Sequence, residues 1–64
     1  MGFKERVKEF REKQGMTQEE FAKLINVSQP TVFNYETGKI KPHINTAIQI
    51  ARIMHIDVKE LLKE

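Results

Sequence analysis

Residues that start or end helices recur every few turns along this sequence and divide it into short amphipathic segments. Phe3, Val7 and Phe10 fall on one face of a helix, and Gly15 follows as a residue that readily takes the positive φ of a helix end. No stretch alternates strictly between apolar and polar residues, as a half-buried strand does. The pattern therefore predicts an all-α fold of short helices.

Two further helices are predicted between Thr17 and Gly38. Thr17 and Glu20 have the spacing of a capping box at a helix start. Ser28 is an N-cap candidate, and Pro30 follows in the first turn, where a backbone N–H has no helical partner in any case. We expect the helix that starts after Ser28 to end at Gly38.

The remaining residues predict two more helices after a loop at Lys39–Pro42. Asn45 is expected to cap the fourth helix, which runs to Met54, and Asp57 is expected to cap the fifth. Segments this short suit a compact bundle better than a coiled coil, which needs a sustained heptad repeat. The sequence therefore predicts a compact five-helix bundle, with residues 1–64 forming a single domain.

Composition narrows the possible functions. The chain has 64 residues and no cysteine, which excludes disulfides and cysteine metal sites. His43 and His55 have no carboxylate at metal-ligand spacing, so we expect no bound metal. The sequence has no nucleophile–base pattern and no glycine-rich phosphate loop, so we expect neither an enzyme nor a cofactor. Without an apolar run of membrane-span or signal-peptide type, the expected location is the cytoplasm.

Charge alone does not indicate a nucleic-acid partner. Eleven basic and nine acidic residues give a net charge of +2 at pH 7, which is only mildly basic. Any DNA-binding function must therefore be argued from a motif.

Residues 18–35 have the residue types that a helix-turn-helix needs at fixed spacing. Ala22 is the small residue at which two helices cross closely. Asn26 is among the few non-glycine residues that readily take positive φ in a turn. The apolar positions after the turn and on the inner face of the second helix are Val27, Val32 and Tyr35.

The chain resembles the Cro/CI-type (XRE-like) helix-turn-helix family from about Phe3 to Leu62. The matching segments are Arg11–Ala22, Val27–Val32, Glu36–Lys39 with Pro42, Ile50–Met54 and Asp57–Leu61. The resemblance implies a lambda-repressor-like DNA-binding domain, with the helix-turn-helix at about residues 17–36 and the recognition helix at about residues 28–36. Asn26 and His55 stand where the family usually has glycine, so His55 is expected to take positive φ.

The resemblance implies a sequence-specific regulator of transcription that binds double-stranded DNA, and we expect a repressor. In this docking mode the third helix enters the major groove. The residues expected to contact bases are Gln29, Pro30, Phe33 and Asn34. The two amides suit adenine N6 and N7, and the proline and phenylalanine suit thymine methyl groups, so we expect a half-site containing A·T pairs.

The residues expected to contact the DNA backbone are Thr17, Gln18, Thr31, Lys39, Lys41 and His43. By resemblance, Gln18 bonds a phosphate from the first turn of its helix, although a capping role alone is also compatible with its position. By resemblance, Arg11 and Glu36 form a structural ion pair between the first helix and the end of the third. The alternative is two solvated surface charges.

Less specific interpretations remain open for several of the residues expected to contact DNA. Gln29 and Asn34 are also compatible with an ordinary polar surface, and Phe33 with a partly buried core position. Three of the residues expected to contact the DNA backbone also have positions that are ordinary for a helix start or a loop: Thr31, Lys39 and Lys41.

A chain this small with a net charge of +2 is expected to bind a palindromic operator as a homodimer. Its half-sites would lie about 34–36 Å apart, and the bound protein would be associated with the nucleoid. By resemblance, the dimer surface lies around residues 53–62. The alternative function is a protein-interaction module on the same fold, a partner of a toxin or an antirepressor. It is suggested by aliphatic residues in excess of what a small bundle easily buries: Ile40, Ile44, Ile48 and Ile53.

Overall fold

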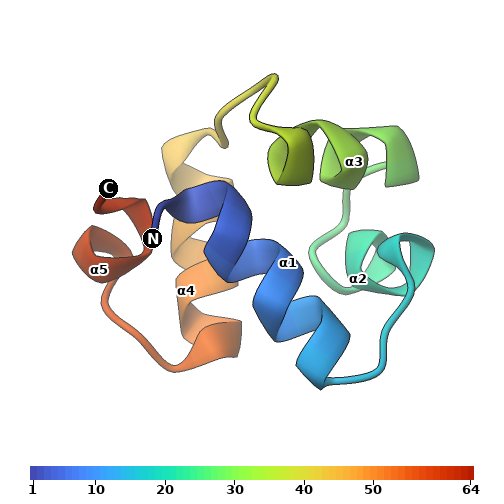
Figure 1. Cartoon of the computed structure of the whole chain (residues 1–64), viewed down its shortest axis with the longest axis horizontal. Coiled ribbons are helices and arrows are strands. Elements are labelled where there is room, and N and C mark those ends of the chain that lie inside the picture. The colour runs from blue at the N-terminus through green and yellow to red at the C-terminus, as the bar shows by residue number, and fades with distance from the viewer.

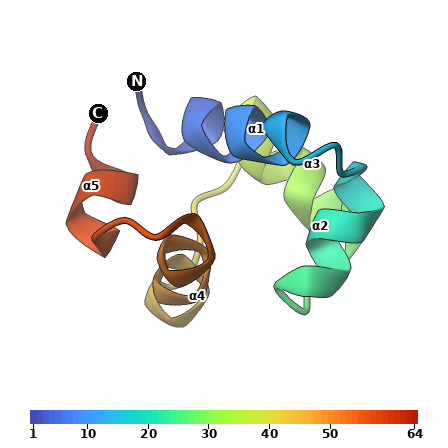
Figure 2. The same cartoon turned by 90° about the horizontal axis from the view of Figure 1, so that it is seen from below.

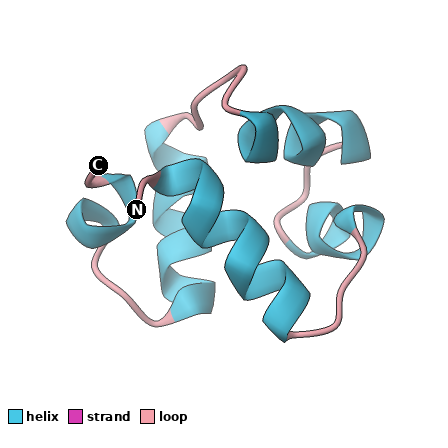
Figure 3. Cartoon of the chain, viewed as in Figure 1, coloured by secondary structure: helices cyan, strands magenta, loops and turns pink.

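Five helices make up most of the chain in the computed structural model, which covers residues 1–64. They are α1 (Phe3–Lys13), α2 (Gln18–Leu24), α3 (Gln29–Thr37), α4 (Ile44–Met54) and α5 (Val58–Leu62). The connections are short, and the chain contains no strand (Figure 3). The predicted all-α, five-helix architecture is confirmed. None of the helices is both long enough and apolar enough to cross a membrane.

Helix α1 crosses the molecule between two pairs of helices. α2 packs on α3, α4 packs on α5, and α1 contacts both α3 and α5 (Figures 1 and 2). The two chain ends lie side by side near α5, where a Cβ added to Gly2 would stand 3.8 Å from Cγ of Glu64. α2 therefore stands at the end of the molecule away from both termini, whereas the last turn of α3 reaches back to the start of α1.

The core collects apolar side chains from all five helices. The buried residues are Val7, Phe21, Ala22, Ile25, Val32, Tyr35, Ala47, Ile50, Ala51 and Leu61. Two edge-to-face aromatic pairs add specific geometry, because Phe3 packs on Tyr35 with ring centroids 5.5 Å apart and Phe10 packs on Phe21 at 6.3 Å. Through these pairs α1 holds both α2 and α3 against the core.

Most helix starts follow the local sequence signals. Thr17 Oγ1 accepts a hydrogen bond from the Glu20 N–H at 3.0 Å, and Glu20 Oε1 accepts one from the Thr17 N–H at 2.8 Å. This is the predicted capping box. Ser28 caps α3 by accepting from the Thr31 N–H, and Asp57 caps α5 through its side chain. These ends are fixed by contacts within a few residues of the chain.

The predicted start of the fourth helix is wrong. α4 begins at Ile44, and His43 occupies its N-cap position without a side-chain hydrogen bond, so Asn45 lies inside the helix. The His43 carbonyl accepts from the Ala47 N–H at 2.9 Å, which starts the helical ladder before Asn45. Helical hydrogen bonding therefore begins two residues before the better capping residue, and Asn45 is an exposed residue of the first turn.

Candidate nucleic-acid interface

The turn between α2 and α3 depends on Asn26 and Ala22. Asn26 takes the left-handed conformation with a φ of 60°, as its residue type predicts. The Val27 N–H then donates to the Ala22 carbonyl at 2.9 Å, which closes the turn. Ala22 is buried where the helices meet, and a longer side chain there would push them apart.

Helix α3 buries one face and exposes the other. Val32 and Tyr35 are in the core. The four residues predicted to contact bases share the outer face, with Asn34 half-buried and the others exposed: Gln29, Pro30, Phe33 and Asn34. Phe33 is 44% exposed, so it is not a core residue. The outer face of α3 therefore carries two amides and an aromatic ring.

Gln29 is bonded to the first turn of α2. Its Nε2 donates to Oε1 of Gln18 at 2.8 Å, and Nε2 of Gln18 donates to Oε1 of Glu36 at 3.1 Å. A residue predicted to read a base and one predicted to contact a phosphate thus share one network. The link from Gln18 to Glu36 is not predictable from the sequence, because residues on two different helices have no common local pattern.

Arg11 and Glu36 form an ion pair between α1 and the end of α3. Nε and Nη2 of Arg11 donate to the two carboxylate oxygens at 2.6 and 3.0 Å, and Nη1 donates to the Met16 carbonyl at 2.8 Å. The side chains are only 12% and 3% exposed, so they are not solvated surface charges. The hydrogen bond with Glu36 is the main cause that raises the pKa of Arg11.

The other residues predicted to contact the DNA backbone have different surroundings. Thr17 and His43 are exposed at helix starts, and the Thr31 hydroxyl lies 2.8 Å from that of Ser28. The Thr31 hydroxyl is therefore already engaged within the N-terminal cap of α3.

The two loop lysines also differ from each other. Nζ of Lys39 lies 5.7 Å from the centroid of the Phe33 ring, next to the outer face of α3. Lys41 instead faces the chain end, with its Nζ 3.6 Å from Oε2 of Glu64. Of the two, Lys39 is placed directly beside the predicted base-contact residues.

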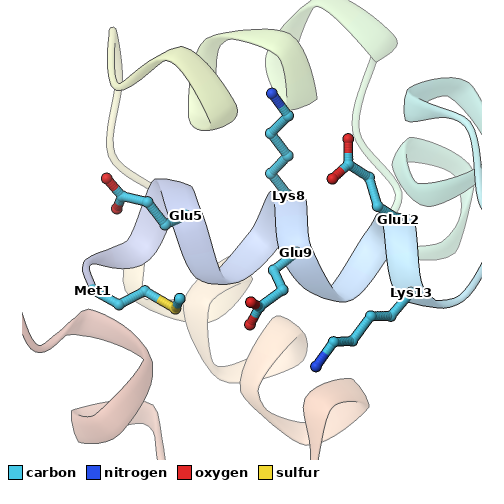
Figure 4. Close-up of a pocket in the computed structure, with 6 residues that line it drawn as sticks. All are labelled: Met1, Glu5, Lys8, Glu9, Glu12 and Lys13. Atoms are coloured by element: carbon cyan, nitrogen blue, oxygen red, sulfur yellow. The ribbon is translucent and has the colours of Figure 1, made fainter.

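The outer face of α1 is a separate surface. It forms an open pocket lined by Met1, Glu5, Lys8, Glu9, Glu12 and Lys13, whose charged side chains extend from one helix (Figure 4). A hydrogen bond to its own backbone is the main cause that lowers the pKa of Glu5. Because acidic and basic groups alternate there, this face does not present the continuous positive charge that suits phosphates.

Known proteins share this arrangement across nearly the whole chain. A model of the helix-turn-helix family matches residues 7–61. The chain belongs to the helix-turn-helix family. One helix-turn-helix-type transcriptional regulator of Archaeoglobus fulgidus is 43% identical over 56 residues, covering 88% of this chain and 80% of that protein. Another from the same organism is 41% identical over 56 residues, with 88% and 79% covered.

Solved structures of two other proteins superpose closely on this chain. A transcriptional regulator from Listeria innocua has a TM-score of 0.88 at 31% identity; the match covers 97% of this chain but only 58% of that one. The P22 c2 repressor, solved with a synthetic operator, has a TM-score of 0.89 at 21% identity, with 98% and 96% covered. The repressor-like fold predicted from the sequence is confirmed.

Proposed function

We propose that this helix-turn-helix protein is a DNA-binding transcriptional regulator, a repressor, that reads a specific base sequence in the major groove with α3. The observation that carries the proposal is the division of α3 into a face anchored in the core and an outer face rich in amides. The major groove is about 12 Å wide and admits one helix. A helix anchored on one side can enter it without losing its own support.

Base recognition is assigned to the outer face of α3. Gln29 and Asn34 carry amides that can bond adenine N6 and N7 together, and each such pair discriminates by about 1–3 kcal/mol. Pro30 and Phe33 offer apolar surface to thymine methyl groups. The proposed half-site therefore contains A·T pairs opposite α3.

Contacts with the DNA backbone are assigned to residues around α3. Gln18 is well placed, because its hydrogen bond to Gln29 sets it beside the base-reading face. Lys39 adds a positive charge next to Phe33. The other proposed contacts are Thr17, Thr31, Lys41 and His43. Such contacts set the register of the protein on DNA and carry no sequence information directly.

The proposed active form is a homodimer on a palindromic operator, present in the cytoplasm and on the nucleoid when bound. Between residues 53 and 62, Leu61 is buried and Ile53 packs against the core, whereas Leu62 is 41% exposed. Leu62 lines a surface groove of about 510 Å³ together with Ile40. Leu62 is therefore the residue of this segment that we assign to the contact between two copies.

Selection of bound duplexes from a random pool tests this function. The purified protein is expected to enrich a symmetric motif, with half-site centres about one helical turn apart. Affinity for the selected duplex should fall steeply as salt is raised, because bound phosphates release counterions. Weak binding without enrichment of any sequence would contradict the proposal.

A second candidate function is binding of another protein on the same fold. Ile40 and Ile44 are exposed, whereas Ile48 and Ile53 are half-buried, so only part of the predicted aliphatic excess reaches the surface. Exposed apolar side chains often belong to protein interfaces, including those between identical chains. This candidate predicts a partner whose affinity changes little with salt, since apolar contacts release no counterions.

A further inference from the structure

A chain of hydrogen bonds runs from a buried charge to the outer face of α3. Glu36 is 3% exposed in its side chain and accepts from Nε2 of Gln18 at 3.1 Å. Gln18 in turn accepts through Oε1 from Nε2 of Gln29 at 2.8 Å. We refer to Glu36, Gln18 and Gln29 as the relay.

The chemistry of the relay permits one direction of donation. An ionised carboxylate only accepts hydrogen bonds, so Gln18 must turn its NH₂ group toward Glu36. The oxygen of Gln18 then faces Gln29, which must also present its NH₂ group. Arg11 donates two further hydrogen bonds of 2.6 and 3.0 Å to the same carboxylate. The buried ion pair therefore determines the amide orientation of both glutamines.

We infer that Glu36 is a positioning residue for base recognition. Through Gln18 it fixes the Gln29 amide, so that Oε1 and the second Nε2 hydrogen remain free to contact DNA. Adenine offers a donor at N6 and an acceptor at N7, which match these two groups, whereas guanine offers acceptors at both O6 and N7. The relay therefore favours adenine over guanine at the base that Gln29 reads. The inference rests on the proposed function.

The substitution Glu36→Gln removes the acceptor-only group that fixes the direction of the relay, and it leaves the size of the side chain unchanged. The new amide has one oxygen for the three N–H groups that the carboxylate accepts, two from Arg11 and one from Gln18, so either its oxygen or its NH₂ group can face Gln18. Both glutamine amides are then free to turn over, and in that orientation Gln29 directs its NH₂ group to the base. The preference for adenine over guanine at this base is expected to fall about tenfold, within the range of one bidentate pair.

Two further variants separate the relay from the stability of the ion pair. Arg11→Lys weakens the ion pair from its other end but leaves the carboxylate facing Gln18, so it is expected to lower Tm without changing the adenine preference. Gln18→Met interrupts the relay and leaves the ion pair intact. It is expected to reduce the adenine preference at the same base, in addition to a uniform loss of affinity from the lost phosphate contact.

The measurement is the ratio of Kd values for matched duplexes that carry adenine or guanine. The base read by Gln29 is first identified as the position that Gln29→Ala relaxes, and the base read by Asn34 is identified in the same way. The expected result is a loss of preference at the Gln29 base alone, with each variant shown to be folded by its melting curve.

Three results would overturn the inference. They are an unchanged ratio in both Glu36→Gln and Gln18→Met, an equal loss at the Gln29 and Asn34 bases, and an equal loss in Arg11→Lys. Failure of the wild-type protein to select any sequence is a different result, because it overturns the proposed function.

Discussion

Asn26 and His55 are the two non-glycine residues whose backbone takes positive φ, at 60° and 58°. Each follows the last turn of a helix, and His55 is the C-cap of α4. Asparagine visits this region readily, whereas a left-handed conformation costs most other residues about 1–2 kcal/mol. The same backbone geometry is therefore expected to be more strained at His55 than at Asn26.

Replacing His55 by glycine should stabilise the protein by about 0.5–1 kcal/mol, because the relieved strain exceeds the entropy that glycine adds to the unfolded chain. For a chain of this size the gain corresponds to a Tm increase of a few degrees, about 4–8 °C per kcal/mol. Asn26→Gly is the matched control and should change Tm less. A lower Tm for His55→Gly would show that contacts of the imidazole outweigh the backbone strain.

The substitution Arg11→Met should destabilise the fold strongly. It leaves the Glu36 carboxylate buried without its cation and the Met16 carbonyl without its donor. Removing one partner of a buried ion pair costs about 3–5 kcal/mol, and the 12% exposure of Arg11 places the expected loss near the lower value. Urea unfolding at neutral pH gives the difference. Glu64→Gln breaks the exposed pair with Lys41 and serves as the control, with little expected change.

The substitution Lys39→Ala should weaken binding to all duplexes alike. Its ammonium group lies beside Phe33 at the proposed interface, and loss of one phosphate contact reduces the salt dependence of log K by about one. Lys8→Ala is the control, because Lys8 lies on the outer face of α1 among acidic side chains (Figure 4). Affinity measured over a salt series distinguishes them. Equal slopes for the wild type and Lys39→Ala would remove Lys39 from the interface.

Burial raises the pKa of the Tyr35 phenol above its ordinary value of 10.0, and a hydrogen bond with Thr46 partly opposes this shift. Folding favours the neutral phenol. The contribution of Tyr35 to the free energy of unfolding is therefore fully present below the pKa of the phenol in the unfolded chain, and it is lost as pH rises through the higher pKa in the folded protein. Tyr35→Phe should therefore lose less stability than the wild type between about pH 9 and pH 11. The free energy of unfolding, measured for both proteins across this range, should fall more steeply with pH for the wild type. Parallel curves would contradict the expected effect.

The substitution Leu62→Glu should dissociate the proposed homodimer, because it places a charge on apolar surface that a second copy would cover. Leu24→Glu is a control of similar exposure, since the two leucines are 41% and 48% exposed and Leu24 lies on α2. Sedimentation with operator DNA should show a monomer–DNA complex for Leu62→Glu and a dimer complex for Leu24→Glu. A dimer in both cases would place the contact elsewhere.

The sequence by itself determined which segments become helices and how most of them begin and end. The capping box of Thr17 and Glu20, the positive φ of Asn26 and the inward positions of Val32 and Tyr35 all follow from residues close together in the chain. Such features are predictable because their energies are local, within a turn or one helix face.

Only the tertiary structure decided where these helices place their side chains relative to one another. α4 begins at Ile44, ahead of the better capping residue Asn45, and the crossing of α2 and α3 brought Gln18 within hydrogen-bonding distance of both Gln29 and Glu36. These contacts depend on how separate helices share one core, and a local pattern of residues does not specify that arrangement.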